Sequence, residues 1–121
     1  GKSVPTEVTI KLIKNSLAFV GDCSGVLLDG FPRKLDQAAM FEMEVKGFRG
    51  GIHLDVSKDI AIQRILESAK SHSRFDPVER FEKKWKSYEK YVLPIVDYYK
   101  GAGKLVQVDA SQHPDDVFAA V

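Results

Sequence analysis

The sequence predicts an α/β fold in which a mostly parallel β-sheet carries helices on both faces. Three short apolar segments have the length and residue types of buried strands, at residues 26–28, 51–56 and 105–108. Between and around them lie segments whose apolar residues recur at helical spacing. Because strands that alternate with helices are joined by crossover connections, we expect a parallel sheet.

The composition is typical of a single soluble domain. The 121 residues include 18 Lys+Arg and 17 Asp+Glu, a net charge of +1. This balance lacks the basic surplus of a nucleic-acid binder, so we expect no nucleic-acid partner. No apolar run reaches the length of a membrane span, so we expect no membrane insertion. The lone Cys23 excludes an internal disulfide and a thiolate zinc site. We therefore expect a cytoplasmic protein, which we take to be a monomer, with residues 1–121 forming one partial domain.

The first half of the chain contains two expected helices and one strand. The first helix covers residues 5–17, with Pro5 at its first helical position and one apolar face. The strand at residues 26–28 follows. The second helix is expected over residues 35–45.

The second half contains the other two strands and three helices. Ser57 is a suitable N-cap for the helix that follows the strand at residues 51–56. The longest helix begins at Pro77 with Asp76 as N-cap and runs towards Tyr99. Pro94 should kink or break it, because proline lacks a backbone donor. After the third strand, a last helix begins near Pro114, and its first turn is acidic.

The residues that follow the first strand are the main candidates for chemistry. Ligands of parallel α/β sheets bind beyond the carboxyl ends of the strands. Asp29-Gly30-Phe31-Pro32-Arg33 places a carboxylate at that point and a guanidinium four residues later. The planar fork of arginine suits phosphate. From spacing alone, a surface ion pair beside a tight turn explains these residues as well as a phosphate or metal-linked site does.

The same string, followed by Asp36-Gln37-Ala38, resembles the signature of the adenylate kinase branch of nucleoside monophosphate kinases. Residues 1–9, 52–64, 93–99 and 103–110 resemble further segments of that family, in the same order. The resemblance implies a P-loop NTPase-like fold. It also implies reversible phosphoryl transfer from Mg-ATP to AMP, with ATP and AMP as partners and Mg²⁺ as the cofactor.

The resemblance assigns roles on the acceptor side. It makes Arg33 the ligand of the α-phosphate of AMP and Gln37 the amide that pairs with the edge of adenine. Relatives that accept pyrimidines usually carry Asn there, so Gln37 favours AMP. Val4 and Gly30 belong to the same pocket, and Asp29 holds Mg²⁺ through water. A solvated helix residue remains the alternative for Gln37, and simple packing for Val4.

The lid, residues 68–76, departs from the family pattern. Of three expected arginines only Arg74 is present, since Ser68 occupies the first position and Lys84 the third. Arg74 and Lys84 are thus the candidate catalytic residues beside Asp29, and Arg74 and Ser68 are the candidates for ATP binding. Phosphoryl transfer depends on stabilising charge, so the loss of two planar forks should weaken catalysis. Lys84 keeps the charge without the fork.

The glycine-rich phosphate-binding loop of the family is not recognisable in the sequence. Gly1-Lys2-Ser3 matches its last letters but lacks the preceding strand and glycine turn. We therefore expect the chain to be the C-terminal two thirds of a longer protein, whose missing N-terminal segment supplies the central strand and this loop. A degenerate, non-catalytic nucleotide-binding or scaffolding module is the alternative.

The three histidines lack the spacing of metal ligands. On a strand, His53 is more often a core histidine whose hydrogen bonds are satisfied. His72 falls in the lid, and His113 is expected at the entry to the last helix.

Overall fold

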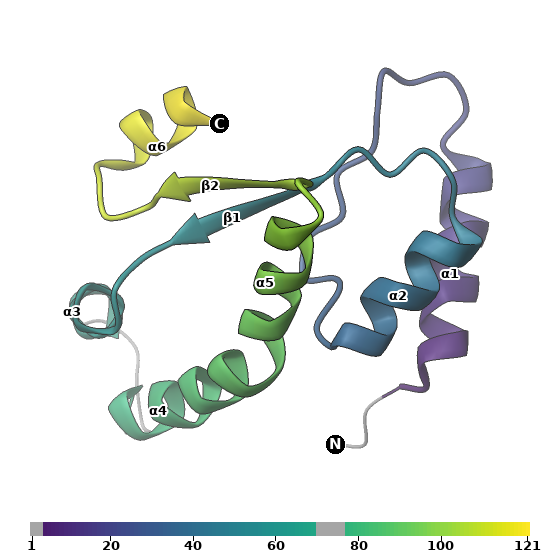
Figure 1. Ribbon diagram of the computed structural model, residues 1–121. Helices are drawn as coiled ribbons and strands as arrows, with labels where there is room; N and C mark the ends of the chain where they lie inside the picture. The colour runs from purple at the N-terminus through teal and green to yellow at the C-terminus, as the bar shows by residue number, and fades with distance from the viewer. Residues whose placement is uncertain (1–3, 70–76) are drawn as a thin grey trace. The chain divides into compact units, whose positions relative to one another are not determined.

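A computed structural model describes residues 4–69 and 77–121 of the chain (Figure 1). The chain forms two compact units, Gly1–Arg49 and Gly50–Val121. The first unit contains the helices α1 (Thr6–Phe19) and α2 (Leu35–Glu44). The second contains, in order, β1 (Gly51–Asp55), α3 (Lys58–Ala69), α4 (Pro77–Ser87), the π-helix η1 (Tyr88–Val92), α5 (Leu93–Gly101), β2 (Leu105–Asp109) and α6 (Pro114–Ala120). This mixture of helices with a parallel sheet confirms the expected α/β class.

Two helices and an aromatic cluster build the core of the first unit. Helix α1 begins directly after Pro5, whose carbonyl accepts from the Val8 and Thr9 amides. Ile10 is fully buried on its inner face. From α2, Phe41 is buried and meets the rings of Phe31 and Phe48 edge-on, with centroids 5.5 and 5.8 Å apart. The apolar positions read from the sequence thus give a small packed core.

The strand expected at residues 26–28 was a wrong prediction. The structure assigns no strand there, and the Leu27 side chain is 82% exposed. A strand is defined by hydrogen bonds to a neighbouring strand. Within residues 4–49 as described, there is no other strand to provide them. The apolar run is therefore present without the pairing that would make it a strand.

The two strands of the second unit form a parallel pair, as expected. Their register runs from Gly51 opposite Leu105 to Asp55 opposite Asp109. The helices α3 to α5 lie between them in sequence and make the crossover connection that parallel pairing requires. At the start of the sheet, Gly50 has φ +152°, and a Cβ there would come within 3.0 Å of the Lys104 carbonyl oxygen. Only glycine allows this close approach.

The long helix expected from residue 77 to 99 is instead three consecutive elements, α4, η1 and α5. The Leu93 amide donates to the Tyr88 carbonyl, five residues back, which is the hydrogen bond of a π turn. Pro94 then falls in the first turn of α5, where its missing N–H needs no partner. Figure 1 shows α4 and α5 meeting at an angle. The chain therefore changes direction at η1 without ending the helix.

Two helix starts are capped by side chains, of which Ser57 was the expected one. The Ile60 amide donates to Ser57 Oγ over 3.3 Å at the start of α3. At the start of α6, the Asp115 amide donates to His113 Nδ1 over 3.2 Å, which confirms the place of this histidine. The expected cap Asp76 and the expected lid residue His72 lie outside the described residues. No helix in the described part of the chain is long and apolar enough to span a membrane.

Helix α5 supplies much of the core of the second unit. Ile95, Val96 and Tyr99 are each less than 10% exposed. They are joined by further buried residues from α4, β2 and the turn after β2: Phe81, Val108 and Ala110. The other sheet residues are less covered, since Ile52, Leu54 and Val106 are each about half exposed.

Candidate functional site

A tight turn at residues 29–33 folds the Arg33 side chain back on its own backbone. Gly30 has φ +73°, and the Phe31–Pro32 peptide bond is cis. Arg33 Nε donates to the Gly30 carbonyl over 2.9 Å. A Cβ at Gly30 would lie 3.4 Å from Arg33 Nη2. Glycine is thus favoured at this position both by the backbone conformation and by the guanidinium beside it.

The turn is tied to the first turn of α2. The Arg33 backbone amide donates to Oε1 of Gln37 over 2.8 Å. Gln37 is half-buried, so the structure does not support the alternative of a freely solvated helix residue. Gly30, Arg33 and Gln37, which the sequence placed in one site, are therefore brought together by hydrogen bonds.

A second hydrogen bond links α1 to the same end of α2. Thr6 Oγ1, on the first residue of α1, donates to Asp36 Oδ2 over 2.7 Å. This partner of Asp36 was not predictable from the sequence, because the contact spans 30 positions along the chain. Val4 lies just before α1 and is 56% exposed, so it is not buried as a packing residue would be. The contact holds the segment after Val4 close to the helix turn that carries Gln37.

Asp29 precedes this turn and is exposed. Within the described residues it forms no ion pair with Arg33, so the surface ion pair considered from the sequence is absent. No group of three or more potential metal ligands occurs in the described part of the chain. A single accessible carboxylate fits a Mg²⁺ ion that keeps most of its water ligands and is otherwise bound by phosphates.

The described lid-side candidates lie on two packed helices of the second unit. Ser68, near the end of α3, donates through its hydroxyl to the Ile65 carbonyl over 3.1 Å. Lys84 is exposed on α4. Arg74, expected between them, lies outside the described residues. Ser68 and Lys84 are therefore the two members of this candidate set that the structure describes.

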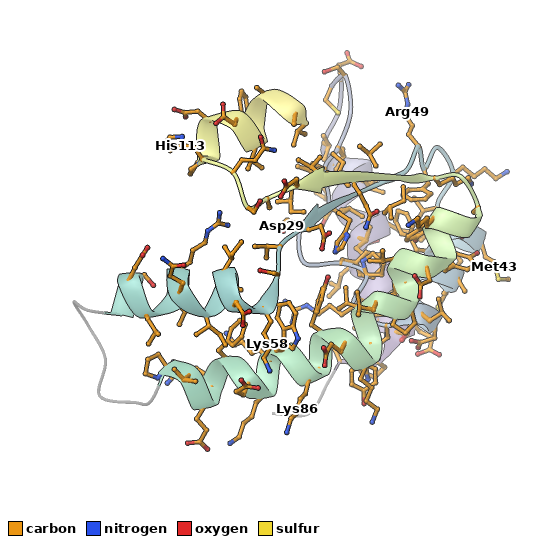
Figure 2. The ribbon with its side chains drawn as sticks, turned by 60° about the vertical axis from the view of Figure 1, so that its left-hand side comes forward. Asp29, Met43, Arg49, Lys58, Lys86 and His113 are labelled. Atoms are coloured by element: carbon orange, nitrogen blue, oxygen red, sulfur yellow. The ribbon has the colours of Figure 1, made fainter. Side chains whose placement is uncertain are left out.

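An ion pair joins α3 to α4. Lys58 Nζ, from the start of α3, lies 2.9 Å from Glu82 Oε2 on α4. Figure 2 shows Lys58 where α3 faces α4. The hydrogen bond to the Glu82 carboxylate raises the pKa of the Lys58 ammonium above its usual value. The pair links the helices that carry Ser68 and Lys84.

A hydrogen-bonded histidine connects the sheet to the π turn. His53 Nε2 lies 2.7 Å from the Tyr88 hydroxyl, and Gln107 Nε2 lies 3.2 Å from His53 Nδ1. Both ring nitrogens are therefore satisfied, as expected for a histidine on a strand. Burial, and secondly the charge of Asp55, raise the pKa of Tyr88 above its usual value. The sequence showed the histidine but not its partners, because the π turn that places Tyr88 was not predictable from helical spacing.

The aromatic residues of α4 and η1 pack in a row. The ring of Trp85 lies 5.6 Å from that of Phe81 and 5.2 Å from that of Tyr88, measured between centroids. Trp85 Nε1 donates to Glu89 Oε1 over 2.9 Å. Trp85 and Tyr88 thus pack against each other within this row.

Comparison with known families was made over the whole sequence. The family model described as adenylate kinase matches residues 1–104. The chain belongs to the adenylate kinase family. This result confirms the resemblance seen in the sequence and the P-loop kinase-like fold that it implied.

Individual relatives include kinases of different monophosphates. The chain is 33% identical to adenylate kinase isoenzyme 1 of Caenorhabditis elegans over all of its length and 59% of the relative's. It is 32% identical to the UMP-CMP kinase of Lentinula edodes, with 97% and 57% of the two chains covered. It is 31% identical to the uridylate kinase of Saccharomyces cerevisiae, with 100% and 61% covered. The chain thus spans about three fifths of the length of these relatives.

Proposed function

We propose that the full-length protein is a nucleoside monophosphate kinase that transfers a phosphoryl group reversibly from Mg-ATP to AMP. This chain would supply the acceptor pocket and the lid. An N-terminal segment of the same protein would supply the phosphate-binding loop. The observation that supports this best is the turn at residues 29–33. There the Arg33 side chain donates a hydrogen bond to the Gly30 carbonyl, and the Arg33 backbone amide donates one to the Gln37 side chain. In line with the lone exposed Cys23, we propose a cytoplasmic enzyme, acting as a monomer.

Arg33 is suited to bind the α-phosphate of the acceptor. Its Nε is committed to the Gly30 carbonyl, which fixes the plane of the guanidinium. The two Nη nitrogens keep donors that can form a bidentate contact with phosphate oxygens. The exposed side chain therefore has both a defined orientation and an available charge.

Asp29 would hold hydrated Mg²⁺ through water. When bound, the ion neutralises charge on the donor phosphates. Arg74 and Lys84 would stabilise charge on the transferring group, and Ser68 and Arg74 would lie against ATP. Lys84, exposed on α4, can supply a positive charge but not a bidentate fork.

A non-catalytic nucleotide-binding or scaffolding module is the second candidate. It is favoured by Ser68 and Lys84, which stand where two family arginines are expected, and by the Ser68 hydroxyl, which is hydrogen-bonded to its own helix. The two functions differ in turnover. A coupled assay of ADP formation by the full-length protein, with Mg-ATP and AMP, should show saturable turnover for the kinase. AMP binding without turnover would favour the module.

A further inference from the structure

We infer that Thr6 and Asp36 are positioning residues of the proposed acceptor site, because their hydrogen bond holds the start of α1 against the start of α2. This inference rests on the proposed function, in which the turn at residues 29–33 and these helix starts bind a nucleoside monophosphate. The two side chains act on each other and not on the substrate. Their role is to fix the distance between the two helix starts before the acceptor binds.

The Thr6 hydroxyl is used outside its own helix. A threonine near a helix start commonly bonds to the backbone of that helix. Thr9 does so, since its hydroxyl donates to the Pro5 carbonyl over 3.4 Å. The Thr6 hydroxyl instead donates to Asp36 Oδ2 on α2 over 2.7 Å. Thr6 and Thr9 are both half-buried, so they form a matched pair that differs in the partner of the hydroxyl.

Asp36 is suited to accept this bond. An ionised carboxylate has no donor, so the proton of the contact comes from the Thr6 hydroxyl. A hydrogen bond from a hydroxyl to a charged oxygen is shorter and stronger than one between neutral groups. Asp36 also lies in the first turn of α2, where the helix dipole favours a negative charge. The carboxylate therefore stabilises the start of its own helix while it binds the start of α1.

The helices α1 and α2 run in the same direction, so their starts lie at the same end of the pair. A second polar link joins them further along, where Lys14 Nζ lies 3.7 Å from Glu44 Oε2. Eight positions separate the two links along α1, and eight separate them along α2. Two positive helix ends therefore lie side by side and repel each other. The carboxylate that accepts from Thr6 offsets this repulsion.

The contact is one residue away from the turn that carries the proposed phosphate ligand. Gln37 follows Asp36 in the first turn of α2 and accepts from the Arg33 backbone amide over 2.8 Å. The Arg33 side chain in turn donates to the Gly30 carbonyl. The bond from Thr6 therefore ties α1 to the same hydrogen-bonded group that orients the guanidinium. Without it, the core at Ile10 would still join the helices, but their starts could separate.

The first test removes the Thr6 hydroxyl in the full-length protein. Thr6→Val keeps the branched shape of the side chain, and we expect it to raise KM and Kd for AMP about three- to tenfold, because binding must then also order the two helix starts. We expect kcat and the KM for Mg-ATP to change by less than about twofold, since the bond does not touch the transferring group. Thr6→Ser keeps a hydroxyl and should bind AMP nearly as the wild type does.

Two comparisons separate positioning from general stability. Thr9→Val is the matched control, and we expect it to leave the affinity for AMP within about twofold of the wild type. Asp36→Ala should weaken AMP binding at least as much as Thr6→Val does, and the double variant should bind no more weakly than Asp36→Ala alone. Equal effects of Thr6→Val and Thr9→Val would overturn the inference, and so would additive effects of the Thr6 and Asp36 substitutions.

Calorimetric titration with AMP, beside steady-state kinetics at saturating Mg-ATP, distinguishes failure of the inference from failure of the proposed function. Unchanged AMP affinity of Thr6→Val, with an active wild type, would overturn the inference and leave the kinase function standing. A wild type that binds AMP without turnover would overturn the kinase function, and the titrations would still decide the inference. Failure of the wild type to bind any monophosphate would overturn both.

Discussion

Arg33 carries the acceptor side of the proposed reaction. We expect Arg33→Ala to lower kcat/KM for AMP by roughly 30-fold or more, since loss of one partner of a charged contact costs about 2 to 5 kcal/mol. Arg33→Lys should recover only part of this loss, because lysine keeps the charge without the fork. Steady-state kinetics with varied AMP would check both variants. Unchanged AMP turnover in Arg33→Ala would remove this residue from the site.

Gly30 provides a second test at the residue scale. Gly30→Ala places a Cβ at φ +73° and 3.4 Å from Arg33 Nη2, so it should lower stability by about 1 kcal/mol and raise KM for AMP. Gly21→Ala is the matched control, because Gly21 has φ +66° but nothing within 4 Å of the added Cβ. We expect a similar fall in melting temperature for both and a raised KM only for Gly30→Ala. Equal KM values would show that the turn does not position Arg33.

The grouping of the candidate acceptor-side residues was predictable because they are neighbours in sequence. Gly30, Arg33 and Gln37 lie within one turn and one helix start, so local geometry brings them together. The contact of Thr6 with Asp36 was not predictable, since it depends on the packing of α1 against α2. The commitment of the Gln37 oxygen to a backbone amide was likewise invisible, because residue type does not fix the orientation of a carboxamide.

At the scale of elements, the π turn shows where helical periodicity fails. The spacing of apolar residues predicts one kinked helix, and a single extra residue in one turn hardly disturbs that pattern. The strand at residues 26–28 failed for a different reason. An apolar run predicts burial, but a strand also needs a paired neighbour. By contrast, β1, β2, the cap Ser57 and the place of His113 at the start of α6 followed from local chemistry alone.

The bond between His53 and Tyr88 should stabilise the π turn. We expect Tyr88→Phe to lower the free energy of unfolding by about 1 kcal/mol, the usual net value of one hydrogen bond. A double-mutant cycle with His53→Ala, measured by denaturant unfolding, should give a coupling of about 0.5 to 1 kcal/mol. Additive effects of the two substitutions would show that the contact adds nothing to stability.

The same tyrosine predicts a pH dependence at the alkaline end. Its pKa in the folded chain is raised above 10.0, so the folded state holds the proton more tightly than the unfolded state does. The resulting contribution to folding stability is present below the pKa of Tyr88 in the unfolded chain. It is lost as the pH rises through the pKa of Tyr88 in the folded chain. Tyr88→Phe should therefore reduce the loss of stability above about pH 10. The check is the free energy of unfolding measured against pH for the wild type and for Tyr88→Phe. Parallel curves above about pH 10 would contradict the raised pKa of Tyr88.

At the scale of the whole molecule, the sheet is short for a stable core. Its two strands leave Ile52, Leu54 and Val106 48, 52 and 57% exposed. Paired strands of this size are marginal in water unless other elements cover them. We expect the 121 residues alone to melt broadly and the full-length protein to melt cooperatively. A sharp transition for the isolated chain, by circular dichroism, would contradict this expectation.

The lid-side charges decide how fast the proposed enzyme can be. We expect Lys84→Arg to raise kcat more than it tightens nucleotide binding, because the added fork meets charge that develops on the moving phosphoryl group. Ser68→Arg should add to this gain. One arginine can contribute roughly 10³-fold in other phosphoryl transferases, and one added to a site not shaped for it should give much less. No change in kcat for either variant would favour the non-catalytic module.

The most direct test of the central claim is a ³¹P NMR spectrum of the full-length protein with Mg-ATP and AMP. A nucleoside monophosphate kinase predicts the two phosphate resonances of ADP, and the same mixture of nucleotides when the reaction starts from ADP alone. A spectrum that stays unchanged while AMP is shown to bind would contradict the account and leave this chain as part of a binding module.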